Sequence, residues 1–84
     1  MKWKVVWNQD AEQGLASIWL NDRFRQRIRD AAQEIDELLA ADPLAVGESR
    51  SGNRRILFVP PLAAVIEVNL AQHLVKVLTI ARYG

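Results

Sequence analysis

Cysteine is absent from this 84-residue sequence, and histidine occurs only once, at position 73. Without thiols the chain forms no disulfide and no thiolate metal site, which is consistent with a reducing compartment. A lone histidine in a predicted turn, among scattered carboxylates, also argues against a catalytic zinc site and against a Ser-His-Asp triad. We therefore predict no metal and no cofactor.

Long hydrophobic runs are also missing, although 50% of the residues are hydrophobic and 25% are charged. No apolar stretch approaches the roughly 18 residues that a membrane-spanning helix needs. The N-terminal stretch MKWKVVWNQD contains an apolar segment that is too short for a secretory signal. We therefore expect one soluble domain, residues 1–84, that is located in the cytoplasm and does not bind membranes.

Proline is scarce, and two of the three prolines stand together at Pro60-Pro61, inside the most apolar part of the chain. Because proline cannot donate to a sheet ladder, this pair marks a connection between strands. A second, polar interruption covers residues 69–73. The segments on either side have the length of strands rather than of helices. The sequence therefore predicts a meander of three antiparallel strands, over Arg54–Val59, Leu62–Val68 and Leu74–Arg82.

A further strand is predicted at the N-terminus, where residues 2–7 alternate between two faces. The alternation places Trp3 and Trp7 on the same face, and we interpret them as core residues that pack against helices. Lys2 and Lys4 lie on the opposite face. They either stay in water or contact a ligand.

Two helices are predicted between this strand and the meander. The first covers residues 11–20, with Asp10 as its capping residue. The second covers residues 23–41, with Asp22 as its cap, and ends at Asp42-Pro43 because a residue before proline avoids the helical conformation. Apolar residues recur in it every three or four positions and predict one buried stripe: Phe24, Ile28, Ala31, Ile35, Leu38 and Leu39.

The order of the predicted elements is strand, helix, helix and three strands. A helical hairpin cannot bury its apolar stripes alone, and an antiparallel sheet offers it one face. The sequence therefore predicts a two-layer α+β fold that consists of an N-terminal strand, a helical hairpin and a three-stranded antiparallel meander. The second face of the sheet stays open and is edged with Lys and Arg, so we expect the functional site there.

Charge is distributed unevenly, although the formal net charge is only +1. Residues 31–48 carry five acidic and no basic side chains, whereas residues 49–84 carry five basic and one acidic. Arginine also occupies positions 23, 25, 27 and 29 in the second predicted helix. These arginines are compatible with nucleic-acid binding. We interpret them instead as a solvated helix face, in which Arg27 is spaced to form ion pairs with Asp30 and Glu34.

Basic residues of the meander form the remaining candidate site. Guanidinium groups match phosphate oxygens and can stabilise charge that develops at phosphorus. Cleavage of RNA can use the 2′-hydroxyl of the substrate as nucleophile, which needs no metal. The residues that can hold a phosphodiester are Arg54, Arg55, Lys76, Arg82 and Tyr83. The alternative is that arginines at strand ends serve only solubility.

Three stretches resemble the RelE/ParE family of type II toxin–antitoxin toxins: AAQEIDELLAADPLAVGES, RRILFVPPLAAVIEV and VKVLTIARYG. In many members a helix that ends in leucines and Asp-Pro leads through a glycine loop to an arginine-rich strand. The resemblance is one of pattern and covers nearly the whole chain. It implies a small toxin that a cognate antitoxin wraps and neutralises.

The resemblance also implies a site. RelE-like members cleave messenger RNA on the ribosome with a few Arg and Lys residues. Arg55 stands where these members have a lysine, and Arg82-Tyr83 resembles the Arg-Tyr of YoeB-like toxins. Ala63 departs from the pattern, because RelE-like members have an arginine there. The implied catalytic residues are Arg55, Arg82 and Tyr83, and the implied substrate-binding residues are Arg54, Lys76 and Lys4.

Two alternatives to RNA cleavage stay open. ParE-like members of the family inhibit DNA gyrase and lack the catalytic set. A member without activity would act only as a binding module. Tyr83 has two corresponding interpretations, as the base that takes the 2′-hydroxyl proton or as a packing residue.

Overall fold

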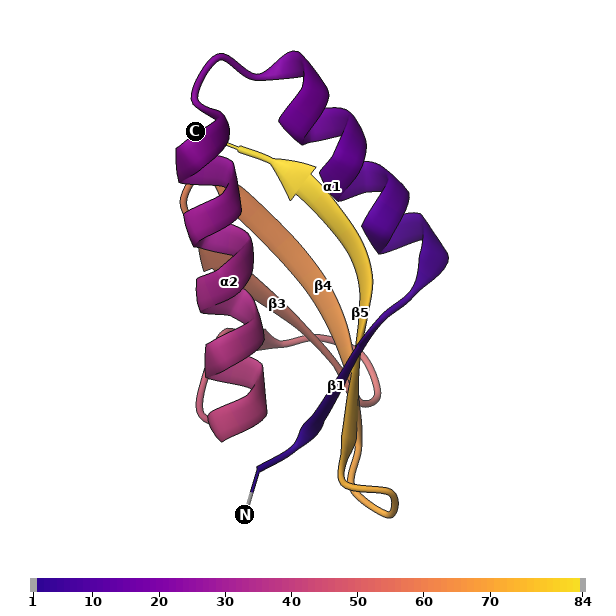
Figure 1. The fold of residues 1–84 in the computed structure, drawn as a ribbon. Helices are drawn as coiled ribbons and strands as arrows, with labels where there is room; N and C mark the ends of the chain where they lie inside the picture. The colour runs from indigo at the N-terminus through magenta and orange to yellow at the C-terminus, as the bar shows by residue number, and fades with distance from the viewer. Residues whose placement is uncertain (1, 84) are drawn as a thin grey trace.

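The computed structural model describes residues 2–83, which form a helical layer on a β-sheet (Figure 1). The elements are β1 (Lys4–Trp7), α1 (Gln9–Asn21), α2 (Arg25–Ala41), β2 (Glu48–Ser49), β3 (Arg54–Val59), β4 (Leu62–Asn69) and β5 (Leu74–Arg82). The predicted fold class is confirmed, and so are the three strands of the meander, of which β4 is one residue longer than predicted. No helix within residues 2–83 is long and apolar enough to cross a membrane.

The strands form one sheet in the order β1-β5-β4-β3-β2. β3, β4 and β5 pair antiparallel, and Pro60-Pro61 forms the connection between β3 and β4, with a cis peptide bond. The prediction of a wholly antiparallel sheet is wrong in one respect, because β1 pairs with β5 in parallel. The two helices separate these strands in the sequence and provide the long connection that parallel pairing requires. β2 is a short edge strand that the sequence pattern does not predict.

The core lies between the helices and one face of the sheet. Four residues of α2, at three- and four-residue spacing, are buried there: Ile28, Ala31, Ile35 and Leu39. The prediction that Phe24 belongs to this stripe is wrong, because α2 begins at Arg25 and the Phe24 side chain is 49% exposed. Leu38 is half-buried at the edge of the core. Alternate residues of β4 supply the opposite wall: Leu62, Ala64, Ile66 and Val68.

The helix caps differ from the predicted ones. α1 begins at Gln9, so the predicted cap Asp10 lies inside its first turn, where a carboxylate suits the positive end of the helix dipole. Asp22 does not cap α2 but accepts a hydrogen bond of 2.7 Å from the Phe24 N–H just before the helix. α1 lies so close to the sheet that a Cβ at Gly14 would be 3.1 Å from a carbonyl oxygen of β5.

The tryptophans of the N-terminal segment pack toward the helical layer, as predicted. The Trp7 indole N–H donates to Asp36 Oδ1 of α2 at 3.1 Å. Trp3 stacks on His73, with 3.9 Å between the ring centroids. His73 lies in the turn between β4 and β5, as predicted, and has a positive φ of 54°. These contacts join the N-terminal segment, residues 3–7, to α2 and to the β4–β5 turn.

Candidate functional site

The face of the sheet opposite the helices is the open face that the sequence predicts, and we call it the outer face. Strand side chains alternate between the two faces. The buried residues of β3 and β4 point toward the helices, so their neighbours Arg54, Phe58 and Ala63 lie on the outer face. The cross-strand pairs Phe58–Ala63 and Ala63–Ala81 place small side chains beside the aromatic ring.

One end of the outer face is basic. Glu67 pairs with Arg54 on one side and with Lys76 on the other, so the three side chains form a row across β3, β4 and β5. The Arg54 Nε lies 4.0 Å from Glu67 Oε2. Lys4 lies on β1 two positions from Val6, which pairs with Lys76. The structure thus brings the three predicted substrate-binding residues to one end of one face.

The other end of the outer face is aromatic. Phe58 and Tyr83 meet edge to face, with ring centroids 4.9 Å apart, and both remain partly exposed. The Tyr83 N–H donates to the Pro61 carbonyl at 2.9 Å, which holds the residue beside the β3–β4 connection. The ring is therefore packed on one side and open to solvent on the other.

Arg55 lies on the helix side of the sheet and is bound to the loop that follows α2. Its Nε donates to the Val46 carbonyl at 3.0 Å, and its NH2 group donates to the Gly47 carbonyl at 3.2 Å. Gly47 has a φ of +71°, and a Cβ there would be 2.4 Å from the Ile56 carbonyl oxygen. The loop therefore needs glycine at this position, and the guanidinium fixes the loop against β3.

Arg82 is bound at the opposite end of the molecule. Its Nε donates to Asp22 Oδ2 in the connection between α1 and α2. This hydrogen bond, together with the one from the Phe24 N–H, lowers the pKa of the Asp22 carboxyl below its usual value. The Asp22 side chain is 7% exposed, so the ion pair is partly shielded from water.

The structure does not bring the three predicted catalytic residues together. β3 and β5 are both antiparallel to β4, so the start of β3 and the end of β5 lie at opposite ends of the sheet. Arg55 pairs with Ile66 of β4 and Arg82 pairs with Leu62, a separation of about 13 Å along that strand. Arg82 reaches toward the helices, whereas Tyr83 lies on the outer face against Phe58.

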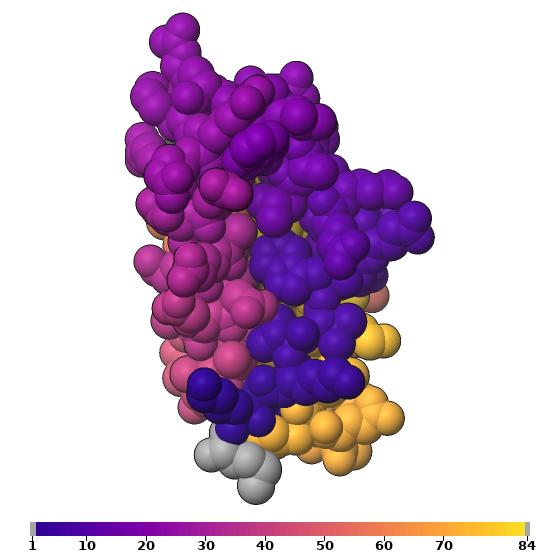
Figure 2. All heavy atoms as spheres, viewed as in Figure 1, coloured from indigo at the N-terminus to yellow at the C-terminus, as the bar shows by residue number. Residues whose placement is uncertain are grey.

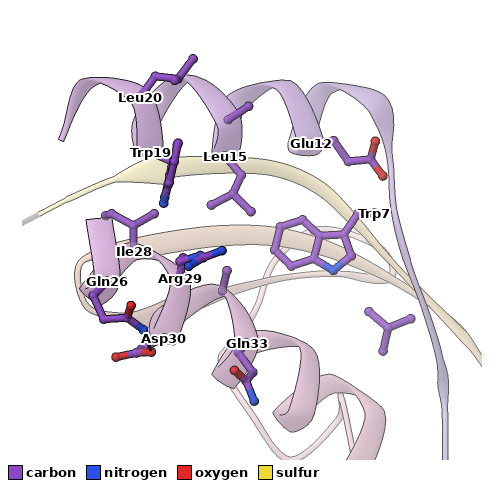
Figure 3. A pocket seen from close by; sticks show the side chains of 13 residues that line it. Trp7, Glu12, Leu15, Trp19, Leu20, Gln26, Ile28, Arg29, Asp30 and Gln33 are labelled. Atoms are coloured by element: carbon purple, nitrogen blue, oxygen red, sulfur yellow. Dashed lines mark hydrogen bonds between the residues drawn. The ribbon is translucent and has the colours of Figure 1, made fainter. Parts of the chain in front are cut away.

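A groove between α1, α2 and β1 is a second feature, which the sequence does not predict. Its cavity volume is about 1100 Å³. Its lining combines apolar side chains, among them Trp7, Leu15 and Trp19, with polar ones such as Arg29 and Gln33 (Figure 3). The Trp19 indole nitrogen is buried between the helices and has no hydrogen-bond partner among residues 2–83. Figure 2 shows the two helices separated on this side of the molecule. Two of the three tryptophans, Trp7 and Trp19, line the groove, and two bulky rings in so short a chain are the signal that could have indicated it.

Within residues 2–83 no three His, Cys, Asp or Glu side chains are arranged to hold a metal ion. The outer face presents guanidinium, ammonium and phenol groups together with the Glu67 carboxylate. The cationic groups bind and orient a polyanion, and a phenol can also exchange a proton.

No protein-family model matches the sequence, and no curated protein matches it. Solved structures do match, over almost the entire chain. A chain of the toxin–antitoxin complex RelBE2 from Mycobacterium tuberculosis has a TM-score of 0.80 and 13% identity, over 98% of this chain and 99% of that one.

Two further structures give the same result. A chain of the chromosomal ParDE toxin–antitoxin system from P. aeruginosa has a TM-score of 0.68 and 21% identity, over 98% of this chain and 97% of that one. A chain of the archaeal RelE–RelB complex from Pyrococcus horikoshii OT3 has a TM-score of 0.71 and 15% identity, over 100% and 98%. The chain therefore has the RelE/ParE-like fold.

Proposed function

We propose that the chain is the toxin of a type II toxin–antitoxin system and that a cognate antitoxin binds and neutralises it. The observation that carries the proposal is the end-to-end match to chains of two RelE–RelB-type complexes and one ParDE system, with TM-scores of 0.68 to 0.80. The resemblance of the helix end, the arginine-rich strand and the C-terminal Arg82-Tyr83 to the same family supports this function from the sequence.

The antitoxin has two surfaces on which to bind. An apolar helix fits the groove between α1 and α2, where Leu20 is 62% exposed at the rim. A strand of the antitoxin can instead pair with a free edge of the sheet, at β1 or at the part of β3 that β2 does not cover. Residues 49–84 carry five basic side chains and one acidic one, and this excess of positive charge favours an acidic partner.

Co-expression of a tagged chain with the product of the adjacent small reading frame tests this binding. Leu20→Glu places a charge at the rim of the groove, and Leu70→Glu is the matched control because Leu70 is 69% exposed in the β4–β5 turn. Leu20→Glu should reduce recovery of the antitoxin at least tenfold, whereas the control should recover it fully. If both variants recover it equally, the groove is not the binding surface. If the tagged chain is recovered alone, soluble and harmless to the host, the toxin function is wrong.

The target in this proposal is messenger RNA on the ribosome, cleaved without a metal. The outer face supports it, because Arg54, Lys76 and Lys4 can hold the phosphate backbone at one end while Tyr83 meets the reacting nucleotide at the other. As the phenolate, Tyr83 takes the 2′-hydroxyl proton, the 2′-oxygen bonds to phosphorus, and the bond from phosphorus to the 5′-oxygen breaks. The departing 5′-oxygen takes a proton from water, and Arg82 stabilises the charge at phosphorus. Arg82 reaches that charge only after its guanidinium turns away from Asp22.

Inhibition of DNA gyrase is the second candidate, and one observation favours it. Both predicted catalytic arginines are engaged in contacts within the protein, at opposite ends of the sheet. A toxin that acts by binding gyrase, or an inert member that binds only its antitoxin, needs no assembled catalytic site.

Induction of the chain, followed by primer extension on translated messages and by plasmid supercoiling analysis, separates these targets. If the chain cleaves RNA, new ends of messages appear after induction of the wild type and are absent after induction of Arg82→Ala or Tyr83→Phe. Cleavage by the purified chain in vitro then continues in the presence of EDTA. Growth arrest with intact messages and altered supercoiling would favour gyrase. If the two variants cleave as well as the wild type does, Arg82 and Tyr83 are not the site.

A further inference from the structure

The connection between α1 and α2 forms one end of the elongated molecule, away from the β4–β5 turn (Figure 1). Arg23, Phe24, Arg25 and Arg27 are exposed there, and we call this group the hairpin tip. Arg29 follows within the next turn of α2 and lines the groove. The hairpin tip is therefore a dense basic surface on the helical layer, separate from the outer face of the sheet.

Arg23 precedes α2, and Arg25 and Arg27 lie in its first turn, where they are unfavourably placed. The first turn of α2 contains basic residues and no acidic one, although the N-terminus of a helix carries a positive partial charge. The predicted ion pairs of Arg27 with Asp30 and Glu34 do not form. The Asp30 carboxylate accepts a hydrogen bond from Gln26 at 2.8 Å, and no ion pair within residues 2–83 includes a hairpin-tip arginine. Proteins break such local rules mainly at functional sites, so this arrangement favours a functional role for the surface.

Aromatic rings orient two of the guanidinium groups. Arg25 lies over the Trp19 ring, 4.6 Å from its centroid, and donates to the Leu20 carbonyl at 3.2 Å. Arg27 lies 5.9 Å from the centroid of the Phe24 ring. Such contacts hold guanidinium groups in place while their outward N–H groups stay available to a ligand. Nearly half of the Phe24 surface remains exposed to solvent.

We propose that the hairpin tip binds single-stranded nucleic acid. Guanidinium groups bind phosphate oxygens bidentately, and an exposed aromatic ring between them offers a base a surface on which to stack. Every nucleotide has a phosphate for the guanidinium groups and a base that can stack on the ring. We therefore expect binding that does not depend on nucleotide sequence. This surface requires neither the antitoxin nor a cleavage site, and the proposal holds whether or not the chain is a toxin.

Fluorescence anisotropy of the purified 84-residue chain with a labelled 15-nucleotide RNA, and with DNA of the same sequence, tests the proposal. Arg23→Gln/Arg27→Gln removes two charges from the hairpin tip. Lys2→Gln/Arg50→Gln removes two charges from exposed positions elsewhere and is the matched control. The hairpin-tip variant should bind at least tenfold more weakly than the control variant, and the slope of log K against log salt should fall by about 1.4.

Phe24→Ala should weaken binding about fivefold or more and leave the salt slope unchanged, because it removes stacking and not charge. The melting temperature of the arginine variant should stay close to that of the wild type, because the helix dipole disfavours Arg27 whereas the Asp22 carboxylate attracts it. An unchanged melting temperature would show that the lost affinity does not come from unfolding. If the two double variants bind the RNA with equal affinity, the proposal is wrong. It is also wrong if an acidic peptide displaces the wild-type chain from RNA while Phe24→Ala binds RNA as tightly as the wild type. The comparison of RNA with DNA of the same sequence shows whether the hairpin tip accepts one polymer or both.

Discussion

Replacement of Arg55 by alanine is expected to destabilise the protein, although the family resemblance assigns this residue to catalysis. The guanidinium donates to two carbonyls of the loop between α2 and β3, at 3.0 and 3.2 Å. A hydrogen bond from a charged group contributes about 1.5–3 kcal/mol. The bond to Val46 is partly buried and the bond to Gly47 is exposed, so we count the first in full and little of the second. The expected loss is about 2–3 kcal/mol, or a fall in melting temperature of roughly 10 °C or more for a domain of this size.

Urea denaturation followed by tryptophan fluorescence measures this loss, and Arg50→Ala is the matched control. Arg50 pairs with Glu48 at 3.3 Å, but both side chains are at least half exposed. Such a surface pair contributes about 0–1 kcal/mol. If Arg55→Ala unfolds at the same urea concentration as Arg50→Ala and yet no longer arrests growth, Arg55 acts in catalysis and its structural role is wrong.

Three further predictions concern the loop, the core and the ion pair at the end of β5. Gly47→Ala should destabilise the chain by more than Gly52→Ala in thermal unfolding, because both residues have positive φ but only at Gly47 would a Cβ meet backbone, at 2.4 Å; equal losses would refute the close approach. Ile35→Ala should lower the free energy of unfolding, measured by urea denaturation, by about 2–5 kcal/mol, and Phe24→Ala by about 0.5 kcal/mol or less, since Ile35 is fully buried and Phe24 is 49% exposed. A larger loss for Phe24→Ala than for Ile35→Ala would show that Phe24 belongs to the core after all. The pKa of Asp22 is lowered below 3.8 in the folded protein, so its ion pair stabilises the fold above that pH and the contribution is lost as the pH falls through the folded-state pKa. The stability difference between wild type and Asp22→Asn should therefore shrink on acidification from about pH 5 to pH 2, and a difference that stays constant would contradict the pair.

The elements that local patterns specify were predictable from the sequence. The meander follows from β-rich segments interrupted by Pro60-Pro61, and α2 follows from a stripe that ends at Asp42-Pro43. The direction of β1 was not predictable in this way, because its partner strand β5 lies about 70 residues further along the chain. The burial of Phe24 also failed, since the start of α2 depends on how the connection from α1 turns and not on helical spacing.

The candidate site was less predictable than the fold, because its side chains find partners that are distant in the sequence. Arg82 binds a residue 60 positions away, and Arg55 binds a carbonyl nine positions away. Spacing indicates neither partner, so the sequence pattern predicts that these arginines at strand ends are available to a substrate. Alternation and antiparallel register place Arg54 and Lys76 on the outer face, which the sequence predicts to be edged with Lys and Arg. Their role in substrate binding stays a prediction.

The proposed toxin function is tested most directly by growth of a bacterial culture in which the chain is expressed from a tightly regulated promoter, with and without the product of the adjacent small reading frame. The proposal predicts that growth stops soon after induction and resumes when the second protein is made together with the first. Immunoblotting of the soluble fraction must show equal amounts of the chain in both cultures. Undiminished growth in the presence of abundant, soluble and folded chain would contradict the proposed function.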